Sequence, residues 1–458
     1  MYTKFIQQRF LILGAGVTGS AVARSLESRG GLVTIADDSA QGAIKPEEID
    51  LSNFDAVVIS PGWRLDHPLI IKVLASNLQI LNEIDLAWQI RSEVSPGQKW
   101  LAVTGTNGKT TTVEMAAKML QIAGLRAVAC GNLGDTVIEA VDRTDAYDYL
   151  VLELSSFQLY WTKQAHFVAA AILNIADDHL DWHGTFDAYA DVKFSILDRA
   201  EIAVLNTDDG QVLQRADRFT GRKVFFSLAT PAPGEIGVVE ELLVDRAFVA
   251  DPLEAAVICE LKDIVPTVPH NVSNALAAAA IARSVDVSHE NIQKALQLFK
   301  PGRHRIETVF ESNAVTWVDD SKATNPHAAA ASLMSHLSVV WIAGGLAKGA
   351  DMNSLVQRCK GRIKAVILIG TDRQLIENAM LKFAPDITRI LVDAPDDYVR
   401  GGNSNSLMEA VVNHARAIAA PGDTVLMAPA CASMDQFISY ADRGDRFAAA
   451  VREVVAHE

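Results

Sequence analysis

The stretch LAVTGTNGKTTT at residues 101–112 constrains the fold of this chain more than any other part of the sequence. An apolar run at its start predicts a strand that ends in a turn bracketed by Gly105 and Gly108. Lys109 then opens a run with helical spacing of apolar residues. A strand, a tight loop and a helix form the setting that a phosphate-binding loop requires. The sequence therefore predicts a phosphate site here, although Val103 replaces the first glycine of the general G-x-x-x-x-G-K-[ST] pattern.

Each part of this loop has a role in binding a phosphate. Glycines let backbone N–H groups turn toward phosphate oxygens, and the helix N-terminus adds free donors and the positive end of its dipole. Lys109 is expected to reach the β- and γ-phosphates, and the Thr110 hydroxyl to bind Mg²⁺. An ordinary glycine-rich turn is the alternative, and the Lys-Thr pair at the helix start disfavours it.

A second glycine-rich loop, GAGVTG at 14–19, lies near the start of the chain. It follows a predicted strand at 10–13 and precedes a predicted helix at 20–28 and a second strand at 32–35 that leads to Asp37. A G-x-G-x-x-G loop with an acid about 20 residues further on is typical of dinucleotide sites. Taken alone, the pattern leaves open an NAD-dependent oxidoreductase, another diphosphate ligand, or glycines that only allow close helix–strand packing.

Strands and helices alternate along most of the sequence, which predicts an α/β fold with mostly parallel sheets. The length of 458 residues suits about three domains. The segment 219–268 is less regular and predicts small strands. Polar breaks near 95–98 and 300–302 separate the domains that we expect. These are a Rossmann-like domain at 1–94, a central P-loop ATPase-type domain at 95–300 and a Rossmann-like domain at 301–458.

Composition narrows the possible partners. The net charge of −15 disfavours a nucleic acid or an anionic membrane, because both require a basic face. The four cysteines form no C-x-x-C pair, which fits reduced thiols in a cytoplasm and gives no metal or redox motif. No apolar run approaches the 18 or so residues of a transmembrane helix, so no membrane span is expected.

Charged side chains follow several predicted strands. Glu153 ends an apolar strand and could bind Mg²⁺ directly or through water. In the segment 177–184, His179 and His183 have the spacing of a zinc pair on a helix, but a glycine and several acids favour a loop. Contact with Mg²⁺ or a substrate is therefore favoured over zinc. Lys193 lies in a predicted helix, where an exposed lysine is the plain expectation.

The segment 319–326 lies between a predicted strand and an alanine-rich helix. Pro326 suits the first turn of that helix, with Asn325 as its cap. Lys322 and Thr324 offer a cation and a hydroxyl, which are suitable groups for holding a small carboxylate. Taken alone, this pattern could be no more than a well-capped helix.

Several stretches, taken together, resemble the Mur ligases, the ATP-dependent enzymes that form amide bonds in peptidoglycan synthesis. The resemblance runs in order along almost the whole chain. DSKATN at 320–325 and ACASMDQF at 430–437 are similar to the members that add D-glutamate. The other stretches are TGTNGKTT at 104–111, GNLG at 131–134, ELSSFQL at 153–159, DHLD at 178–181 and HNVSN at 270–274.

The resemblance implies a cytoplasmic three-domain ligase that uses ATP and Mg²⁺ to join D-glutamate to UDP-N-acetylmuramoyl-L-alanine through an acyl phosphate. It implies that the third domain closes over the second and excludes water. Lys193 matches a lysine that these enzymes carbamylate, and a carbamate would be an anionic oxygen ligand for Mg²⁺. We expect a monomer, with no nucleic acid partner and no membrane span.

The resemblance also assigns residues to ATP and the metal. The implied ATP-binding residues are Gly105, Thr106, Asn107, Gly108, Lys109, Thr110, Thr111, Asn271, Asn274, Arg305 and Asp320. The implied metal ligands are Thr110, Glu153, His179 and the carbamate of Lys193. The implied catalytic residues are Lys109, Glu153, His179, Lys193 and Lys348.

Two further sets belong to the other substrates. The implied contacts of the UDP substrate are Val17, Thr18, Asp37, Ser60, Pro61, Gly62, Asn132 and His179. Ser39 stands where a basic residue is expected, so the uracil contacts differ in detail. The implied D-glutamate residues are Lys322, Thr324, Ser433, Met434 and Tyr440, the last of which is usually Phe in this family.

Three other functions stay open on the sequence. An NAD-dependent oxidoreductase would leave the loop at 105–110 without a role. A non-catalytic UDP-sugar or nucleotide sensor would not need an intact set of Lys109, Glu153 and Lys193. Another amino-acid-adding ligase of the same family would differ only in the amino acid that it accepts.

Overall fold

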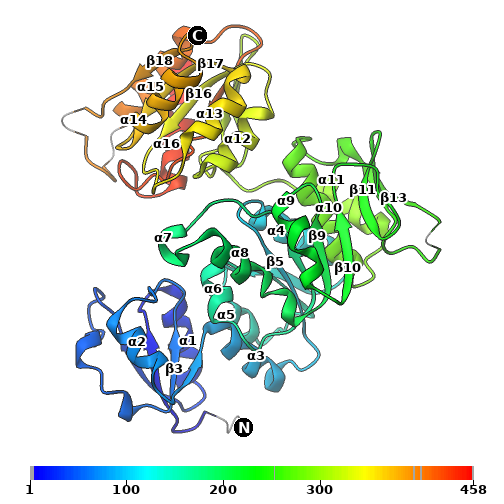
Figure 1. Cartoon of the computed structure of the whole chain (residues 1–458), viewed down its shortest axis with the longest axis vertical. Helices are drawn as coiled ribbons and strands as arrows, with labels where there is room; N and C mark the ends of the chain where they lie inside the picture. Colours follow the sequence, from blue (N-terminus) through cyan, green and yellow to red (C-terminus); the bar gives the residue numbers. More distant parts are fainter. Residues whose placement is uncertain (1–4, 252, 396–397, 403–404, 456–458) are drawn as a thin grey trace. The chain divides into compact units, whose positions relative to one another are not determined.

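The computed structural model describes residues 5–251, 253–395, 398–402 and 405–455, whose strands form three sheets (Figure 1). The chain divides into two compact units, Met1–Phe299 and Lys300–Glu458. The first unit contains two of the sheets and the second unit contains the third. This confirms the expected α/β fold class, while the residue boundaries of the three domains stay a prediction. No helix in the described part of the chain is long and apolar enough to cross a membrane.

The first sheet has four described strands, all parallel, in the order β2-β1-β3-β4. Helix α1 begins at Val17, earlier than the expected Ser20, because Gly19 packs closely on the preceding turn. A Cβ at Gly19 would lie 1.8 Å from the carbonyl oxygen of Gly14. The elements are β1 (Arg9–Leu13), α1 (Val17–Glu27), β2 (Leu32–Ala36), β3 (Ala56–Ile59), α2 (Pro68–Leu74), β4 (Gln79–Leu81) and α3 (Glu83–Val94).

The central sheet orders its nine strands, as far as the chain is described, as β13-β12-β11-β10-β9-β8-β5-β7-β6. Neighbouring strands from β11 to β6 in this order pair in parallel, and β12 is antiparallel to both β11 and β13. The segment 219–268 therefore does form small strands. Side chains of β5 alternate between two cores, with Leu101 and Val103 on one face and Trp100 and Ala102 on the other. The strands are β5 (Lys99–Thr104), β6 (Ala127–Gly131), β7 (Tyr149–Glu153), β8 (Phe167–Ile172), β9 (Ala200–Asn206), β10 (Arg222–Phe226), β11 (Glu235–Val239), β12 (Leu242–Asp245) and β13 (Ala256–Glu260).

Helices cover both faces of the central sheet. Helices α4 and α10 pack against one another and against the core that contains Leu101 and Val103. Phosphate-loop strand β5 lies between β7 and β8, so three strand ends meet around its loop. The helices are α4 (Lys109–Ile122), α5 (Val137–Asp142), α6 (Ser156–Trp161), α7 (Leu180–His183), α8 (Phe186–Phe194), α9 (Gly210–Arg215), α10 (Pro269–Arg283) and α11 (His289–Leu298).

The third sheet has, among the residues that the structure describes, six strands in the order β14-β15-β19-β16-β17-β18. Only β14 is antiparallel to its neighbour within this described set. Apolar cores lie on both faces. The elements are β14 (Glu307–Ser312), β15 (Val315–Asp319), α12 (Pro326–Met334), β16 (Val339–Gly344), α13 (Met352–Cys359), β17 (Ile363–Ile369), α14 (Arg373–Phe383), β18 (Thr388–Leu391), α15 (Ser406–Ile418), β19 (Thr424–Met427) and α16 (Tyr440–Val455).

Helix α3 attaches the first sheet to the central one, and Figure 1 shows it beside α5. The buried carboxylate of Asp85 accepts hydrogen bonds from three successive backbone N–H groups of residues 163–165, at 2.7, 2.9 and 3.0 Å. Buried Glu83 accepts one from the N–H of Ile138 at 2.8 Å, and burial raises the pKa of Glu83 to about 7. Polar contacts and a shared apolar core therefore join these two sheets in one unit.

Candidate active site

The predicted phosphate loop is present between β5 and α4. Gly105 and Gly108 have φ angles of 155° and 86°, in the region that favours glycine. A Cβ at Gly108 would lie 2.3 Å from Oδ1 of Asn274, so this side chain lies directly against the loop. Lys109 Nζ donates to the carbonyl oxygens of Gly105 at 3.0 Å and Thr106 at 2.9 Å. The lysine thus bends over the loop that it is expected to serve.

The end of β8 holds this loop in place. Asn174 Oδ1 accepts a hydrogen bond from the N–H of Asn107 at 2.8 Å, and Asn174 Nδ2 donates to the carbonyl of Asn107 at 3.0 Å. The hydroxyl of Thr106 lies 3.0 Å from the hydroxyl of Tyr189. Asn174 was not among the predicted site residues. Its position directly after an apolar strand, at the same sheet edge as the loop, is the signal that could have identified it.

Lys193 lies at the same loop, although it is distant in sequence. Its side chain is buried, with 2% of its surface exposed, and Nζ donates to the carbonyl of Gly105 at 2.9 Å. The Nζ atom also lies 4.7 Å from the centroid of the Tyr189 ring. Burial and then the charge of Lys109 lower the pKa of Lys193 well below its usual value. The expectation of an exposed lysine is therefore wrong, and the side chain can be a neutral amine.

Glu153 ends β7 beside the phosphate loop and is 3% exposed. Its Oε1 atom accepts a hydrogen bond from Asn132 Nδ2 at 2.9 Å. Its Oε2 atom is buried and has no hydrogen-bond partner within the described chain. A buried carboxylate oxygen costs free energy unless a donor or a cation meets it. Glu153 therefore offers a carboxylate oxygen of the type that Mg²⁺ prefers, on the strand beside the one that leads into the phosphate loop.

The segment 177–184 was expected to be a loop, and residues 177–179 and 184 do lie outside any helix, but Leu180–His183 form the single helical turn α7. His179 precedes that turn with a φ of 53°. The ring of Phe157 lies 4.7 Å from that of His179 and stacks on that of His183 at 5.8 Å, measured between centroids. His183 Nε2 lies 2.9 Å from Ser156 Oγ, and burial lowers the pKa of His183 to about 4. His183 is thus a packed neutral ring, whereas His179 is partly exposed.

Residues assigned to the UDP end of the substrate follow β1, β2 and β3. Asp37 accepts hydrogen bonds from the N–H groups of Ala15, Ser39 and Ala40, each at 2.9 Å, and these lower the pKa of Asp37 to about 2. The carboxylate therefore organises the two loops around it, and Ser39 also donates its hydroxyl at 3.2 Å. Val17 is 76% exposed at the start of α1. The remaining members of this set are Thr18 in the same turn and Ser60, Pro61 and Gly62 after β3.

Hydrogen bonds connect the loop after β3 with the turn that contains His179. Trp182 Nε1 donates to the carbonyl of Trp63 at 3.2 Å, and Trp63 directly follows Gly62. Arg64 donates to the carbonyl of Asp181 at 3.4 Å. The predicted UDP loops and the predicted metal side of the site therefore lie next to each other within one unit.

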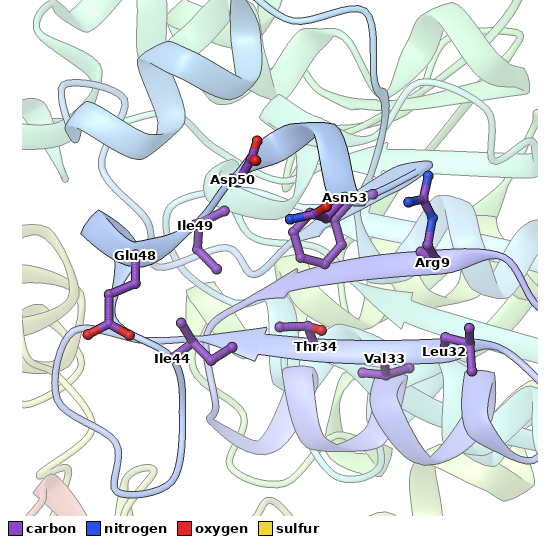
Figure 2. A pocket seen from close by; sticks show the side chains of 10 residues that line it. Arg9, Leu32, Val33, Thr34, Ile44, Glu48, Ile49, Asp50 and Asn53 are labelled. Carbon is purple, nitrogen blue, oxygen red and sulfur yellow. The ribbon is translucent and has the colours of Figure 1, made fainter.

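A hollow of about 320 Å³ lies at another place on the first sheet, between β2, the start of β1 and the segment 44–54 (Figure 2). Its lining includes the acids Glu48 and Asp50, which disfavour a phosphate group. The guanidinium of Arg9 in this lining is already paired with Asp55 at 2.7 Å. This hollow does not contain the residues assigned to the nucleotide. Its lining residues are Arg9, Leu32, Val33, Thr34, Ile44, Glu48, Ile49, Asp50, Asn53 and Phe54.

The residues assigned to adenine and to nucleotide closure fall in both units. Asn271 and Asn274 are buried in the first turns of α10, and Asn271 donates to the carbonyl of Pro266 at 2.9 Å. In the second unit, Asp320 is 8% exposed, and burial raises the pKa of Asp320 to about 7 while the charge of Arg305 opposes this. The adenine-side residues are therefore fixed within the first unit, and Asp320 is fixed within the second.

In the second unit, the structure brings two of the assigned D-glutamate residues into direct contact. Lys322 Nζ lies 3.9 Å from the centroid of the Tyr440 ring, which stabilises the cation. Ser433 is buried, whereas the side chain of Met434 is 55% exposed. Lys348 is exposed in the loop after β16.

The start of α12 is as expected from the sequence. Asn325 caps the helix by accepting the N–H of Ala328 at 2.9 Å, and Pro326 occupies its first turn. Thr324 directly precedes this cap, and its N–H donates to the carbonyl of Lys322 at 2.8 Å. The strand end of β15 and the helix cap thus fix the backbone that presents Lys322 and Thr324.

A buried pair that no sequence pattern predicted lies next to this loop. His304 Nδ1 lies 2.7 Å from Asp319 Oδ2, and the bond to Asp319 raises the pKa of His304. Glu307 accepts the N–H of His304 at 2.9 Å. A Cβ at Gly444 would lie 2.2 Å from His304 Nδ1, so α16 packs tightly on the pair. The acid at the end of β15 was the only sequence signal for it, and the histidine is distant from that strand end in sequence.

Family models match most of the described chain. The model of the Mur ligase middle domain matches residues 103–282. The model described as "Mur ligase, glutamate ligase domain" matches residues 304–431. The first model contains the phosphate loop, Glu153, His179 and Lys193, and the second contains Lys322 and Thr324.

Curated relatives cover nearly the whole chain. The UDP-N-acetylmuramoylalanine--D-glutamate ligase of Streptomyces avermitilis is 43% identical over 96% of this chain and 97% of its own. The protein of the same name from Thermobifida fusca is 44% identical over 97% of this chain and 98% of its own.

Solved structures have the same fold at low identity. A pseudomurein peptide ligase type C from Methanothermus fervidus has a TM-score of 0.61 at 20% identity and covers 98% of this chain and 100% of that one. The MurF ligase of Thermotoga maritima in complex with ADP has a TM-score of 0.59 at 16% identity and covers 99% of this chain and 96% of that one. At these identities the likeness concerns the fold alone.

Proposed function

Because the chain belongs to the Mur ligase family, we propose that it is an ATP-dependent carbon–nitrogen ligase that joins D-glutamate to UDP-N-acetylmuramoyl-L-alanine. Relatives more than 40% identical over nearly the whole chain are named for this reaction. One observation in the molecule supports it best: Lys109 and Lys193 both donate to the carbonyl of Gly105. In addition, Glu153 Oε2 is buried and has no hydrogen-bond partner among the described residues. The products are ADP and phosphate, and we place the reaction in cytoplasmic peptidoglycan precursor synthesis by a monomer.

The first step is a phosphoryl transfer. The alanine carboxylate oxygen attacks the γ-phosphorus of ATP, the bond to the bridging oxygen breaks, and ADP leaves an acyl phosphate. Such transfers depend mainly on positioning and charge neutralisation. The backbone donors of the loop at 105–108, the N-terminus of α4 and the ammonium of Lys109 provide both. Asn274, which lies against Gly108, supports the adenine side of the same nucleotide.

The second step forms the amide bond. The neutral amine of D-glutamate attacks the acyl carbon, the bond to phosphate breaks, and the nitrogen loses a proton. Recognition of D-glutamate must involve its two carboxylates, because the amine has to stay free. Lys322 and Thr324 provide a cation and a hydroxyl for this purpose, with Ser433, Met434, Tyr440 and Lys348 completing the proposed pocket.

A divalent cation fits the donors at the phosphate loop. Thr110, Glu153, His179 and Lys193, the last as a carbamate, would hold Mg²⁺, which neutralises phosphate charge when bound. Burial favours the neutral amine of Lys193, and only the neutral amine reacts with CO₂. The nitrogen attacks the carbon of CO₂ and loses a proton, which converts the side chain into an anion. The contact of Lys193 with Gly105 at the phosphate loop supports the proposal that such an anion would take part in the metal site.

Phosphate release tests the proposed reaction directly. The full chain is incubated with ATP, Mg²⁺, UDP-N-acetylmuramoyl-L-alanine and one amino acid from a panel of D- and L-forms. We expect release with D-glutamate and not with L-glutamate, L-lysine or meso-diaminopimelate. Release with a different amino acid would assign the chain to another branch of the family, and no release with any of them would support the nucleotide sensor.

Nucleotide competition tests the role of the first sheet. We expect UDP to bind the full chain and to compete with the UDP substrate, because Asp37 and the loop after β3 border the turn that contains His179. Tight NAD binding that UDP does not displace would contradict this assignment and favour the oxidoreductase.

A further inference from the structure

Arg443 is a completely buried guanidinium in helix α16, with 0% of its surface exposed. It lies at the carboxyl ends of three adjacent strands, β15, β19 and β16. Its Nε donates to Ser321 Oγ at 2.9 Å, and its Nη2 donates to the carbonyl of Ser321 at 3.0 Å. Both Nη atoms lie 3.2 Å from the carbonyl of Cys431, and Nη1 lies 3.5 Å from that of Gly344. One side chain therefore bonds to the last residue of β16 and to the loops that follow β15 and β19.

A charge in this position is costly. Burial lowers the pKa of Arg443 to about 10, yet the guanidinium stays protonated at neutral pH. Its hydrogen-bond partners among the described residues are carbonyl oxygens and one hydroxyl, so no carboxylate of that part of the chain offsets the burial through a direct hydrogen bond. The arrangement is also tightly packed, because the next residue, Gly444, has no room for a Cβ. A buried cation with this geometry points to a requirement for exact spacing of the three loops.

The same loops contain the residues proposed for the amino acid. Ser321 directly precedes Lys322, Cys431 lies two positions before Ser433, and Gly344 begins the loop that leads to Lys348. Ser321 Oγ, which accepts from Arg443, itself donates to the carbonyl of Tyr440 at 2.8 Å. The backbone next to Lys322 and close in sequence to Ser433 is thus bonded to one guanidinium.

We propose that Arg443 is a positioning residue for the amino-acid substrate, which sets the spacing of the loops after β15, β16 and β19 without contacting the substrate itself. This inference depends on the proposed function of that pocket. A guanidinium suits the task because its planar set of N–H groups can reach several carbonyls at once. A lysine in the same place keeps the charge but has fewer donors and no fixed plane, so it cannot span all three loops.

The test compares Arg443→Lys with Arg446→Lys in the full chain. Arg446 lies on the same helix, is largely buried and donates to Asp442 at 2.9 Å and to the carbonyl of Gly402 at 2.6 Å, so it is a matched control. Initial rates are measured with ATP, the UDP substrate and D-glutamate varied in turn. We expect Arg443→Lys to raise the KM for D-glutamate about tenfold or more, as a small displacement of binding groups does. The KM for the UDP substrate and all three values of Arg446→Lys should stay near those of the wild type. The KM for ATP should change much less than that for D-glutamate, because only Asp320, next to Ser321, connects this loop to the proposed nucleotide site.

Ser321→Ala is the second variant, because it removes only one acceptor of Arg443 and should still fold. It should raise the KM for D-glutamate by less than Arg443→Lys does, again without an effect on the UDP substrate. Equal rises in all three KM values, or a lower melting temperature with an unchanged KM for D-glutamate, would show a merely structural role. Wild-type enzyme that does not use D-glutamate would instead overturn the proposed function.

Discussion

A buried basic side chain lies at a sheet end in each unit, and both donate to backbone carbonyls. Lys193 donates to Gly105, and Arg443 donates to Ser321, Cys431 and Gly344. Burial lowers the pKa of both, but that of Arg443 only to about 10. A lysine begins from a lower pKa and can become a neutral amine, whereas a guanidinium keeps its charge. The same kind of burial thus produces a side chain that can react in one unit and a fixed structural charge in the other.

Of the variants that test this comparison, Lys109→Ala should lose the most activity. Lys109 donates to the same Gly105 carbonyl as Lys193. Loss of a preorganised charge at the transferring phosphoryl group costs about 3–4 kcal/mol, or about 10²–10³ in rate. Phosphate release by the folded variant measures this. Lys118→Ala, further along the same helix, is the control and should stay active. Near-normal turnover of Lys109→Ala would remove the phosphate loop from the mechanism.

Lys193 should respond to CO₂, whereas Arg443 should not. We expect Lys193→Ala and Lys193→Arg to lose about a hundredfold in rate, because each removes a proposed metal ligand. Wild-type activity should fall in CO₂-depleted buffer and return with bicarbonate, and a small carboxylate should partly restore Lys193→Ala. Mass spectrometry of the wild type under CO₂ provides a readout independent of activity. Full activity of either variant without an additive would exclude the carbamate.

Glu83 is a buried carboxyl, and it extends the comparison of buried ionisable groups to an acid. Its folded pKa of about 7 lies above its ordinary value near 4.5, so the folded state binds the proton more tightly. The free energy of unfolding should therefore fall as pH rises from about 4.5 through 7, by about 3 kcal/mol at most. Glu83→Gln should remove this loss and be more stable than wild type at pH 8, with little difference at pH 4.5.

Denaturant unfolding of the full chain at both pH values measures the effect of Glu83→Gln. Glu139→Gln is a control of opposite sign, because the Thr136 and Arg24 contacts lower the pKa of Glu139. That variant should lose stability relative to wild type as pH rises. Equal pH dependence of Glu83→Gln and wild type would show that burial does not affect this carboxyl as described.

Of the variants of Lys109, Lys193, Glu83 and Lys322, Lys322→Ala should have the smallest effect. A charge-assisted hydrogen bond contributes about 1.5–3 kcal/mol, so the KM for D-glutamate should rise about tenfold or more. Thr324→Ala should act in the same direction, and exposed Lys360→Ala should have no effect. A modest change in the KM for ATP is compatible with this, because Asp320 lies two residues away. An unchanged KM for D-glutamate in both loop variants would place the amino acid elsewhere.

Local signals in the sequence predicted much of the fold and the phosphate loop. Apolar runs that end in Gly105 or Glu153 lie in β5 and β7, and the Asn325 cap begins α12 as expected. These features depend on neighbouring residues, so sequence spacing determines them. The start of α1 and the helical turn α7 differ from the prediction. Gly19 packs on the carbonyl of Gly14, and His183 stacks on Phe157, and spacing of apolar residues reveals neither contact.

The buried charges could not be predicted in the same way. Lys193 and Arg443 lie in helices whose sequences contain many polar residues, so each position is compatible with an exposed surface. Their burial depends on which loops the sheet order brings together. The resemblance assigned Lys193 to the metal site without this information, but it assigned nothing to Arg443, Asn174 or His304.

Helix α3 determines where this chain can be recombined with its relatives. Its buried Asn82, Glu83 and Asp85 bond to backbone of the central part of the chain, so the helix belongs energetically to the central sheet. In a chimaera joined at residue 94, α3 would come from the other protein. Any buried acid of that helix that lacks its backbone donors would then stay without a hydrogen-bond partner. A junction between Leu81 and Asn82 leaves these bonds intact. The boundary between exchangeable parts therefore lies one helix earlier than the polar linker at 95–98 suggests.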